Sequence, residues 1–160
     1  MQISYTPIGT IHSPFTDLAG MPIQPTSETS APGTVHLHPQ FTPALQDLEG
    51  FSHVILIYHF HQASRVELTV TPFMDSEPRG IFATRAPTRP NPIGLSVVVL
   101  KSVKGAVLHL ENVDILDGTP LLDIKPYVPK FDTPRDARAG WLGHEDADVR
   151  QARSDDRFQG

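Results

Sequence analysis

Three arginines and three prolines crowd into the segment from position 79 to position 94. The arginines are Arg79, Arg85 and Arg89, and no acidic residue lies among them. Because proline fixes its own backbone and disfavours helix in the residue before it, we expect a stiff, extended loop. A guanidinium group is a planar fork of donors that suits carboxylate or phosphate. The segment therefore predicts an anion-binding loop. The alternative is a solvated turn whose arginines pair with surface acids.

Three acidic residues, Asp114, Asp117 and Asp123, lie in or near the turn Asp-Gly-Thr-Pro at residues 117–120. Aspartate and glycine are common in β-turns for geometric reasons alone, so a plain turn is one interpretation. The other interpretation is a local acidic site. An acidic, carbonyl-rich turn facing the arginine-rich segment would suit a zwitterionic ligand, which has both a cationic centre and a carboxylate.

Two pairs of histidines are spaced two residues apart, His36 with His38 and His59 with His61. In a strand this spacing places both imidazoles of a pair on one face, as metal ligands require. No third ligand stands at a motif spacing and the chain has no cysteine, so we expect no metal site. For His59 and His61 the plain alternative is a pair of hydrogen-bonded histidines at the rim of a buried strand. We favour a ligand-facing role for His61 and the adjacent Gln62.

The composition limits the possible classes of function. The chain of 160 residues has a net charge of −5, which argues against a nucleic-acid binder that is basic over its whole surface. Positions 79 to 110 hold five bases and no acid, so a local positive patch could still contact phosphates or an anionic ligand. No apolar run approaches 18 residues and the first residues do not resemble a signal peptide. We therefore expect no membrane span and a cytoplasmic location.

The hydrophobic pattern predicts a mainly all-β fold with one or two short helices, either a barrel or a sandwich. A helix is expected over residues 42–50, with Thr42 as N-cap and Pro43 at the first position. Residues 16–33 are expected to form a loop. Residues 1–130 are expected to form one domain and residues 131–160 a polar, partly disordered tail. Strands are expected at residues 3–12, 34–38, 53–61, 66–70, 94–103 and 106–110, with a further hairpin joining 113–116 to 121–124.

Five sequence blocks, at residues 7–15, 48–53, 79–85, 89–96 and 117–127, resemble the TsaA-like family, also called TrmO. The most specific are Arg-Pro-Asn-Pro-Ile-Gly at 89–94 and Asp-Gly-Thr-Pro at 117–120 followed by Asp-Ile-Lys-Pro-Tyr at 123–127. The resemblance runs from about residue 5 to 130. It implies a single β-barrel-like domain, a homodimer, S-adenosyl-L-methionine as cofactor and N6-methylation of threonylcarbamoyl-adenosine next to the tRNA anticodon.

The resemblance also implies site residues. Candidates for contact with tRNA phosphates are Arg79, Arg89, Lys101 and Lys104. The cofactor contacts carried over by motif are Pro25, Thr26, Ser27, His61, Gln62, Arg85, Leu95, Asp117, Gly118, Thr119 and Pro120.

We expect Arg85 to pair with the carboxylate of the cofactor, Asp117 or turn carbonyls to hold its ammonium, and Leu95 to pack on its adenine. The proton acceptor stays open between a histidine nitrogen, a carboxylate of the acidic turn and solvent. Fuller family members carry a separate C-terminal domain that helps with tRNA, whereas about 30 polar residues follow the barrel here. A regulatory module that binds the cofactor, or an enzyme that methylates a small molecule, is therefore the second hypothesis.

Overall fold

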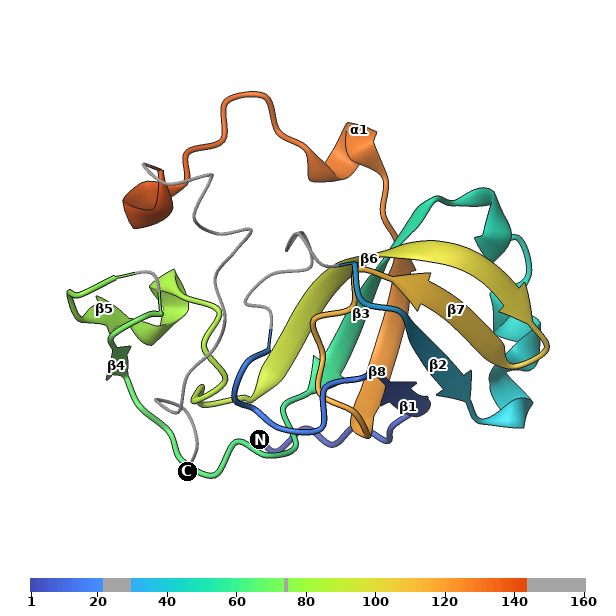
Figure 1. Cartoon of the computed structure of the whole chain (residues 1–160), viewed down its shortest axis with the longest axis horizontal. Coiled ribbons are helices and arrows are strands. Elements are labelled where there is room, and N and C mark those ends of the chain that lie inside the picture. Colours follow the sequence, from blue (N-terminus) through green and yellow to red (C-terminus); the bar gives the residue numbers. More distant parts are fainter. Residues whose placement is uncertain (22–29, 74, 144–160) are drawn as a thin grey trace.

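The computed structural model describes residues 1–21, 30–73 and 75–143. Six antiparallel strands close into a barrel in the order β1, β2, β7, β6, β3, β8 (Figure 1). The expectation of a mainly-β barrel is confirmed, and a sandwich is excluded. The strands are β1 (Gly9–His12), β2 (Gly33–Leu37), β3 (His53–His59), β6 (Ile93–Lys104), β7 (Val107–Glu111) and β8 (Thr119–Pro126).

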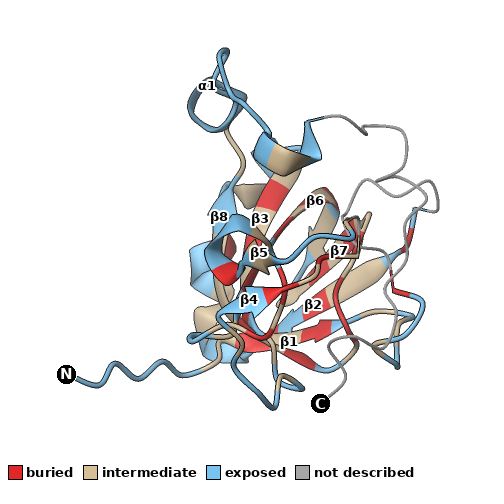
Figure 2. Ribbon diagram, turned by 90° about the vertical axis from the view of Figure 1, so that its left-hand side faces the viewer, coloured by how far each residue is buried: buried red, intermediate tan, exposed pale blue. Residues whose placement is uncertain are grey.

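Alternate residues of each barrel strand face the interior. Val54, Leu56 and Tyr58 of β3 are buried, and so are Ser96 and Val98 of β6, while their neighbours along the strand are more exposed. The strand period of two therefore fills one continuous apolar core, which Figure 2 shows as the buried inner surface of the barrel. Burial of these side chains is the main stabilising contribution to the fold.

A smaller lobe stands beside the barrel (Figure 1). Strands β4 (Thr69–Val70) and β5 (Arg79–Gly80) pair only with each other, and one 3₁₀ turn, Ile81–Ala83, follows. This lobe has its own cluster of buried side chains, Val70, Ile81 and Ala86, with Phe73 packed against them. The arginine-rich segment leaves this lobe and enters β6.

Two backbone hydrogen bonds fix the arginine-rich segment against the chain that follows β3. The amide of Phe60 donates to the carbonyl of Pro92 at 2.8 Å, and the amide of Glu67 donates to the carbonyl of Thr88 at 2.9 Å. Beyond the 3₁₀ turn the segment is irregular, as its prolines predict. It is thus a braced connection between the two lobes.

Two sequence predictions of strands are too long. Only Gly9–His12 of the segment 3–12 forms a strand, and residues 1–6 are exposed in an arm that extends from the barrel (Figure 2). Only Thr69–Val70 of the segment 66–70 forms a strand, and it pairs with β5 rather than with the barrel. Pro7 removes one donor from the first segment, which explains its late start.

Short helices are present near the helix expected over residues 42–50, but their bounds, their type and the N-cap differ from the prediction. Two 3₁₀ helices, Pro39–Leu45 and Leu48–Gly50, occupy this region, and His38 rather than Thr42 precedes the first of them. The hydroxyl of Thr42 donates to the carbonyl of Pro39 at 2.8 Å. Pro43 lies inside the first helix, where its missing N–H prevents a regular α-helical bond.

The hairpin expected between residues 113–116 and 121–124 is also wrong. Residues 112–118 form an irregular segment after β7, and β8 pairs with β1 and β3. Val113, Ile115 and Leu116 are buried nonetheless. Their apolar character resembles a strand, but in the fold it covers the barrel core. The predicted hairpin at Lys104–Gly105 is confirmed, because β6 pairs with β7 around it.

The chain after β8 reaches back to the smaller lobe (Figure 1). It contains a short helix α1 (Pro129–Asp132) and the 3₁₀ turn Gly140–Leu142. The indole Nε1 of Trp141 donates to the carbonyl of Ala83 at 2.8 Å, and the Arg79 guanidinium lies 5.7 Å from the centre of the Trp141 ring. The proposed boundary at residue 130 stays a prediction. No helix within the described ranges has the length and apolarity needed to cross a membrane.

The packing of Tyr58 against Gly94 gives a direct test of the barrel. A Cβ atom at position 94 would overlap the Tyr58 ring. We expect Gly94→Ala to lower the free energy of unfolding by about 1–3 kcal/mol, since overpacking forces side chains out of their rotamers. Gly80→Ala is the matched control, because a Cβ there meets no atom within 4 Å and the backbone is extended. Urea unfolding of both variants measures the difference, and equal stabilities would contradict the packing.

Candidate functional site

A chain of three hydrogen-bonded side chains lies at the end of the barrel where β6 begins. The Tyr58 hydroxyl lies 2.9 Å from Oγ of Ser96, and Ser96 Oγ donates to Oδ1 of Asp114 at 2.6 Å. Ser96 has one hydroxyl proton and gives it to Asp114, so it accepts the proton of Tyr58. The chain of donors therefore runs from the phenol to the carboxylate.

Burial controls the protonation of both ends of this chain. It raises the pKa of the Asp114 carboxyl to about 7, because the bond from Ser96, a backbone hydrogen bond and the charge of Arg85 offset only part of the desolvation cost. Burial, and then the charge of Asp114, also raises the pKa of Tyr58. The positive charge of Arg85 opposes both shifts.

A pocket of about 70 Å³ opens beside this chain. Tyr58 and Asp114 line it together with three residues selected from the sequence, His61, Gln62 and Thr119. They come from β3, the turn after it, the segment before β8 and the first residue of β8. The structure therefore brings part of the expected cofactor site together. The rest of the wall includes the apolar side chains of Leu18, Met21, Phe60, Pro87, Ile115 and Leu116.

His61 has a defined tautomer in this pocket. Its Nδ1 lies 3.4 Å from Oγ1 of Thr119, whose hydroxyl already donates to the carbonyl of Leu116 at 2.6 Å. Nδ1 is therefore the donor, and Nε2 keeps its lone pair. Burial, and then the charge of His59, lowers the pKa of His61 below its usual value. The ring is consequently neutral at neutral pH.

Arg89 is the internal brace of the arginine-rich segment. Its Nη1 donates to the carbonyl of Thr84 at 2.8 Å and lies 3.3 Å from the carbonyls of Ile81 and Ala86. Its guanidinium also lies 5.9 Å from the centre of the Phe82 ring. These contacts hold the turn in which Arg85 stands. Arg89 therefore stiffens the loop, whatever else its remaining nitrogens bind.

Arg79 matches the alternative in which an arginine pairs with a surface acid. Its Nε lies 2.6 Å from Oδ2 of Asp75, and this hydrogen bond is the main reason why the pKa of Asp75 is lowered. The other face of the guanidinium meets Trp141. Thus Arg79 pairs with an acid and Arg89 binds carbonyls, whereas the charge of Arg85 lowers the pKa of Asp114 and Tyr58.

The residues of the Asp-Gly-Thr-Pro turn face two different parts of the molecule, the pocket and the end of β1. Thr119 is buried in the pocket, whereas Oδ1 of Asp117 lies 3.1 Å from Nδ1 of His12 and accepts the backbone amide of Ser13, also at 3.1 Å. The amide bond to Ser13 is the main cause of the lowered pKa of Asp117. Gly118 has a positive φ of 78°, which the tight turn requires, and Pro120 pairs with Thr10 of β1.

The three acids of this region do not form one site. Asp114 lies in the pocket, Asp117 contacts the β1 end, and the carboxylate of Asp123 pairs with Lys125 at 2.8 Å. The expected local acidic site is therefore reduced to Asp114.

Leu95 and the two lysines of β6 lie away from the pocket. Leu95 is 47% exposed, and it points to the outer face of the barrel because its neighbour Ser96 points inward. Lys101 and Lys104 stand near the far end of β6, at most about 30 Å along the strand from Leu95. Lys101 pairs with Glu111 at 3.3 Å. The four candidate phosphate contacts therefore fall into two separate groups.

Three of the expected cofactor contacts, Pro25, Thr26 and Ser27, lie outside the described residues. Among the residues that are described, no group of three or more histidines, cysteines or acids is arranged to hold a metal ion. Nε2 of His36 contacts the hydroxyl of Thr34 at 3.2 Å.

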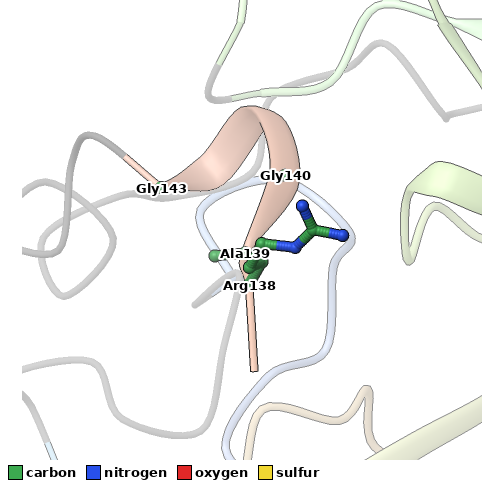
Figure 3. Close-up of a pocket in the computed structure, with 4 residues that line it drawn as sticks. All are labelled: Arg138, Ala139, Gly140 and Gly143. Atoms are coloured by element: carbon green, nitrogen blue, oxygen red, sulfur yellow. The ribbon is translucent and has the colours of Figure 1, made fainter. Parts of the chain in front are cut away.

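A second hollow lies on the chain after the barrel. Arg138, Ala139, Gly140 and Gly143 line it, and Figure 3 shows the Arg138 side chain beside the 3₁₀ turn. It shares no lining residue with the pocket at Asp114. None of the expected site residues belongs to it.

Sequence reasoning missed Tyr58 and Ser96 as site residues. Tyr58 lies in an apolar run that indicates a buried strand, and Ser96 is a lone serine in another such run. Their role depends on the register in which Tyr58 faces Gly94 across two strands. Gly94 directly after the proline-rich segment was the available signal, since a strand glycine can mark a close approach.

Comparison with known proteins shows which family this chain resembles. The model of the tRNA-methyltransferase O N-terminal domain family (TrmO_N) matches residues 10–133. A probable S-adenosyl-L-methionine-binding protein of Pyrococcus abyssi is 54% identical over 158 residues, which cover 99% of this chain and 86% of that protein.

Two longer bacterial proteins are also similar. The crystal structure of TrmO from Pseudomonas aeruginosa superposes with a TM-score of 0.74 at 46% identity and covers 88% of this chain. A tRNA (adenine(37)-N6)-methyltransferase of Escherichia coli is 40% identical over 144 residues, or 84% of this chain. The chain spans 63% of the first protein and 61% of the second.

The raised pKa of Asp114 predicts how stability depends on pH. The folded chain holds this proton more tightly than the unfolded chain, so the stabilising contribution is full below about pH 4 and is lost as pH rises through about 7. Asp114→Asn removes the titration. Between about pH 5 and pH 8 we expect the variant to gain up to about 3 kcal/mol relative to the unchanged chain. Urea unfolding at both pH values measures this gain, and a constant difference would show that the carboxyl is not buried.

Proposed function

This chain belongs to the TrmO family, and from that premise we propose that it is an S-adenosyl-L-methionine-dependent methyltransferase. Its proposed acceptor is N6 of threonylcarbamoyl-adenosine next to the anticodon of tRNA. The observation that carries the proposal is the pocket at Asp114. All of its lining residues fall within the span 10–133 that matches the family, and it joins acidic, imidazole and apolar groups beside the arginine-rich segment.

The residues of the pocket fit one end of the cofactor. A whole ligand of this size needs about 300–1,000 Å³, so a pocket of about 70 Å³ holds only a part of it. In our proposal Arg85 pairs with the carboxylate of the methionine moiety, because a guanidinium fork suits a carboxylate. The apolar wall around Phe60 and Ile115 excludes water from the reacting centre.

S-adenosyl-L-methionine supplies the methyl group on its sulfonium. The transfer breaks the sulfur–carbon bond, forms a carbon–nitrogen bond at N6 and releases one proton from N6. His61 can accept that proton in our proposal, because its ring is neutral and Nε2 keeps a lone pair. In-line alignment of the two reactants supplies most of the remaining rate enhancement.

The second candidate function is a cofactor-binding module or a methyltransferase with a small-molecule acceptor. The name of the Pyrococcus abyssi relative claims binding only. In addition, Arg79 and Arg89 are engaged within the chain, and the bases of β6 lie far from them. These features favour weaker binding of tRNA than a continuous basic patch would provide.

We further propose that two copies associate through the outer face of β3 and β6. Leu95 and Ile93 are exposed there, and Ile57 and Val97 are partly exposed. Such a stripe of apolar side chains on one sheet face is typical of an interface. Leu95 points away from the pocket, so a second copy offers the simplest way for this leucine to meet a bound cofactor.

Methyl transfer to tRNA tests the proposed activity. With tritiated S-adenosyl-L-methionine and bulk tRNA that bears threonylcarbamoyl-adenosine, we expect incorporation of label by the unchanged chain. Arg85→Ala should lower it at least about tenfold, the effect of losing one charge-assisted hydrogen bond. Arg135→Ala, a change of the same type on the exposed chain after the barrel, is the control. Cofactor binding by calorimetry without any label on tRNA would favour the second candidate function.

Light scattering tests the proposed dimer. The unchanged chain should have about twice the mass of one 17.6 kDa chain. Leu95→Asp should yield the monomer, because a carboxylate would be buried at the interface without a partner. Phe131→Asp is the control, since Phe131 is 76% exposed and belongs to α1 rather than to β3 or β6. A monomeric mass for the unchanged chain would exclude the dimer.

A further inference from the structure

Asp114 is held in place by its neighbours in the chain. The segment between β7 and β8 begins with Asn112 in a left-handed conformation, φ 59°, and the side chains of Val113 and Ile115 on either side of Asp114 are buried. Two anchored neighbours leave the Asp114 backbone little freedom. Its carboxylate is oriented by Ser96, and Ser96 by Tyr58. The position of this carboxylate in the pocket is therefore fixed before any ligand binds.

The surroundings of this carboxylate favour a positive charge. Its desolvation outweighs both the hydrogen bond from Ser96 and the attraction of Arg85, so the ionised form is poorly compensated. The other titratable groups of the pocket supply no compensating charge, because Tyr58 and His61 are neutral at neutral pH. A cationic group of a ligand placed here would form a charge-assisted hydrogen bond in a low-dielectric site.

Arg85 favours a negatively charged group of the ligand, because its guanidinium is positively charged. Its charge lowers the pKa of both Asp114 and Tyr58, which line the pocket, although Arg85 itself is exposed and is not one of the lining residues. An α-amino acid head, with an ammonium and a carboxylate on one carbon, has the complementary pair of charges. The pocket volume of about 70 Å³ also suits such a head better than a nucleoside.

The turn aspartate is a poorer partner for an ammonium. Oδ1 of Asp117 is already engaged by His12 and by the amide of Ser13, and its side chain is 39% exposed. It does not line the pocket. The expectation that Asp117 holds the ammonium of the cofactor therefore gives way to its neighbour three residues earlier.

We propose that Asp114, oriented by Ser96 and Tyr58, binds the α-ammonium of the amino acid head of S-adenosyl-L-methionine while Arg85 binds its carboxylate. The inference rests on the proposed function of this pocket. It adds Asp114 as the residue that binds the α-ammonium. Because recognition is of the ammonium rather than of the sulfonium, the demethylated product S-adenosyl-L-homocysteine shares it. A thioether that lacks the head, 5′-methylthioadenosine, does not.

Calorimetry with these three ligands tests the inference. We expect Asp114→Asn to weaken the binding of S-adenosyl-L-methionine and S-adenosyl-L-homocysteine by the same factor, about 10- to 100-fold, the effect of one charge-assisted hydrogen bond. Binding of 5′-methylthioadenosine should change less than about twofold. Asp123→Asn is the matched control, because Asp123 lies on β8 with Lys125 as its partner and outside the pocket.

Other outcomes overturn the inference in distinguishable ways. A loss confined to S-adenosyl-L-methionine would assign Asp114 to the sulfonium, and an equal loss for all three ligands would mean that the variant damages the whole pocket. If the unchanged chain binds none of them, the proposed function itself fails. Should Asp114→Asn not fold, Ser96→Ala replaces it, and the same pattern with a smaller factor is expected because the carboxylate loses its orienting donor.

Discussion

The Tyr58 ring can lie against β6 only because the residue opposite it is glycine. That packing brings the phenol to Ser96, two residues further along the same face of β6. Ser96 can then give its proton only to Asp114, whose carboxylate becomes an oriented acceptor inside the barrel end. One close approach between two strands therefore determines the polar chemistry of the pocket, and the arginine-rich segment ends where β6 begins.

The barrel and the smaller lobe contribute different parts of the site. The barrel supplies rigid walls, since its strands are closed on themselves and its core is continuous. The smaller lobe supplies the positive charge of Arg85, held by the carbonyl contacts of Arg89 and by backbone bonds to the chain after β3. A charged group on a braced loop over a closed barrel loses little freedom when it binds an anion, which favours affinity.

The sequence predicted the all-β class, the β6–β7 hairpin and the stiff arginine-rich segment, because these follow from local periodicity and from proline. The choice of a barrel over a sandwich came from the family resemblance. It misjudged the apolar run at residues 113–116, where burial against the barrel end, rather than strand pairing, explains the pattern. His61, Gln62 and Thr119 line one pocket, and their role as cofactor contacts stays a prediction. Tyr58 and Ser96 were missed, since the contact between them depends on the register of two strands far apart in the chain, and Gly94 was the one sequence signal of their close approach.

In the proposed complex, Asp114 and Arg85 together bind the amino acid head of the cofactor. A crystal structure of the chain with S-adenosyl-L-methionine tests this arrangement most directly. We expect the α-ammonium within hydrogen-bond distance of Asp114, about 2.7–3.2 Å, and the carboxylate on Arg85. A head bound instead at Asp117 and His12, or in the hollow beside Arg138, would contradict it.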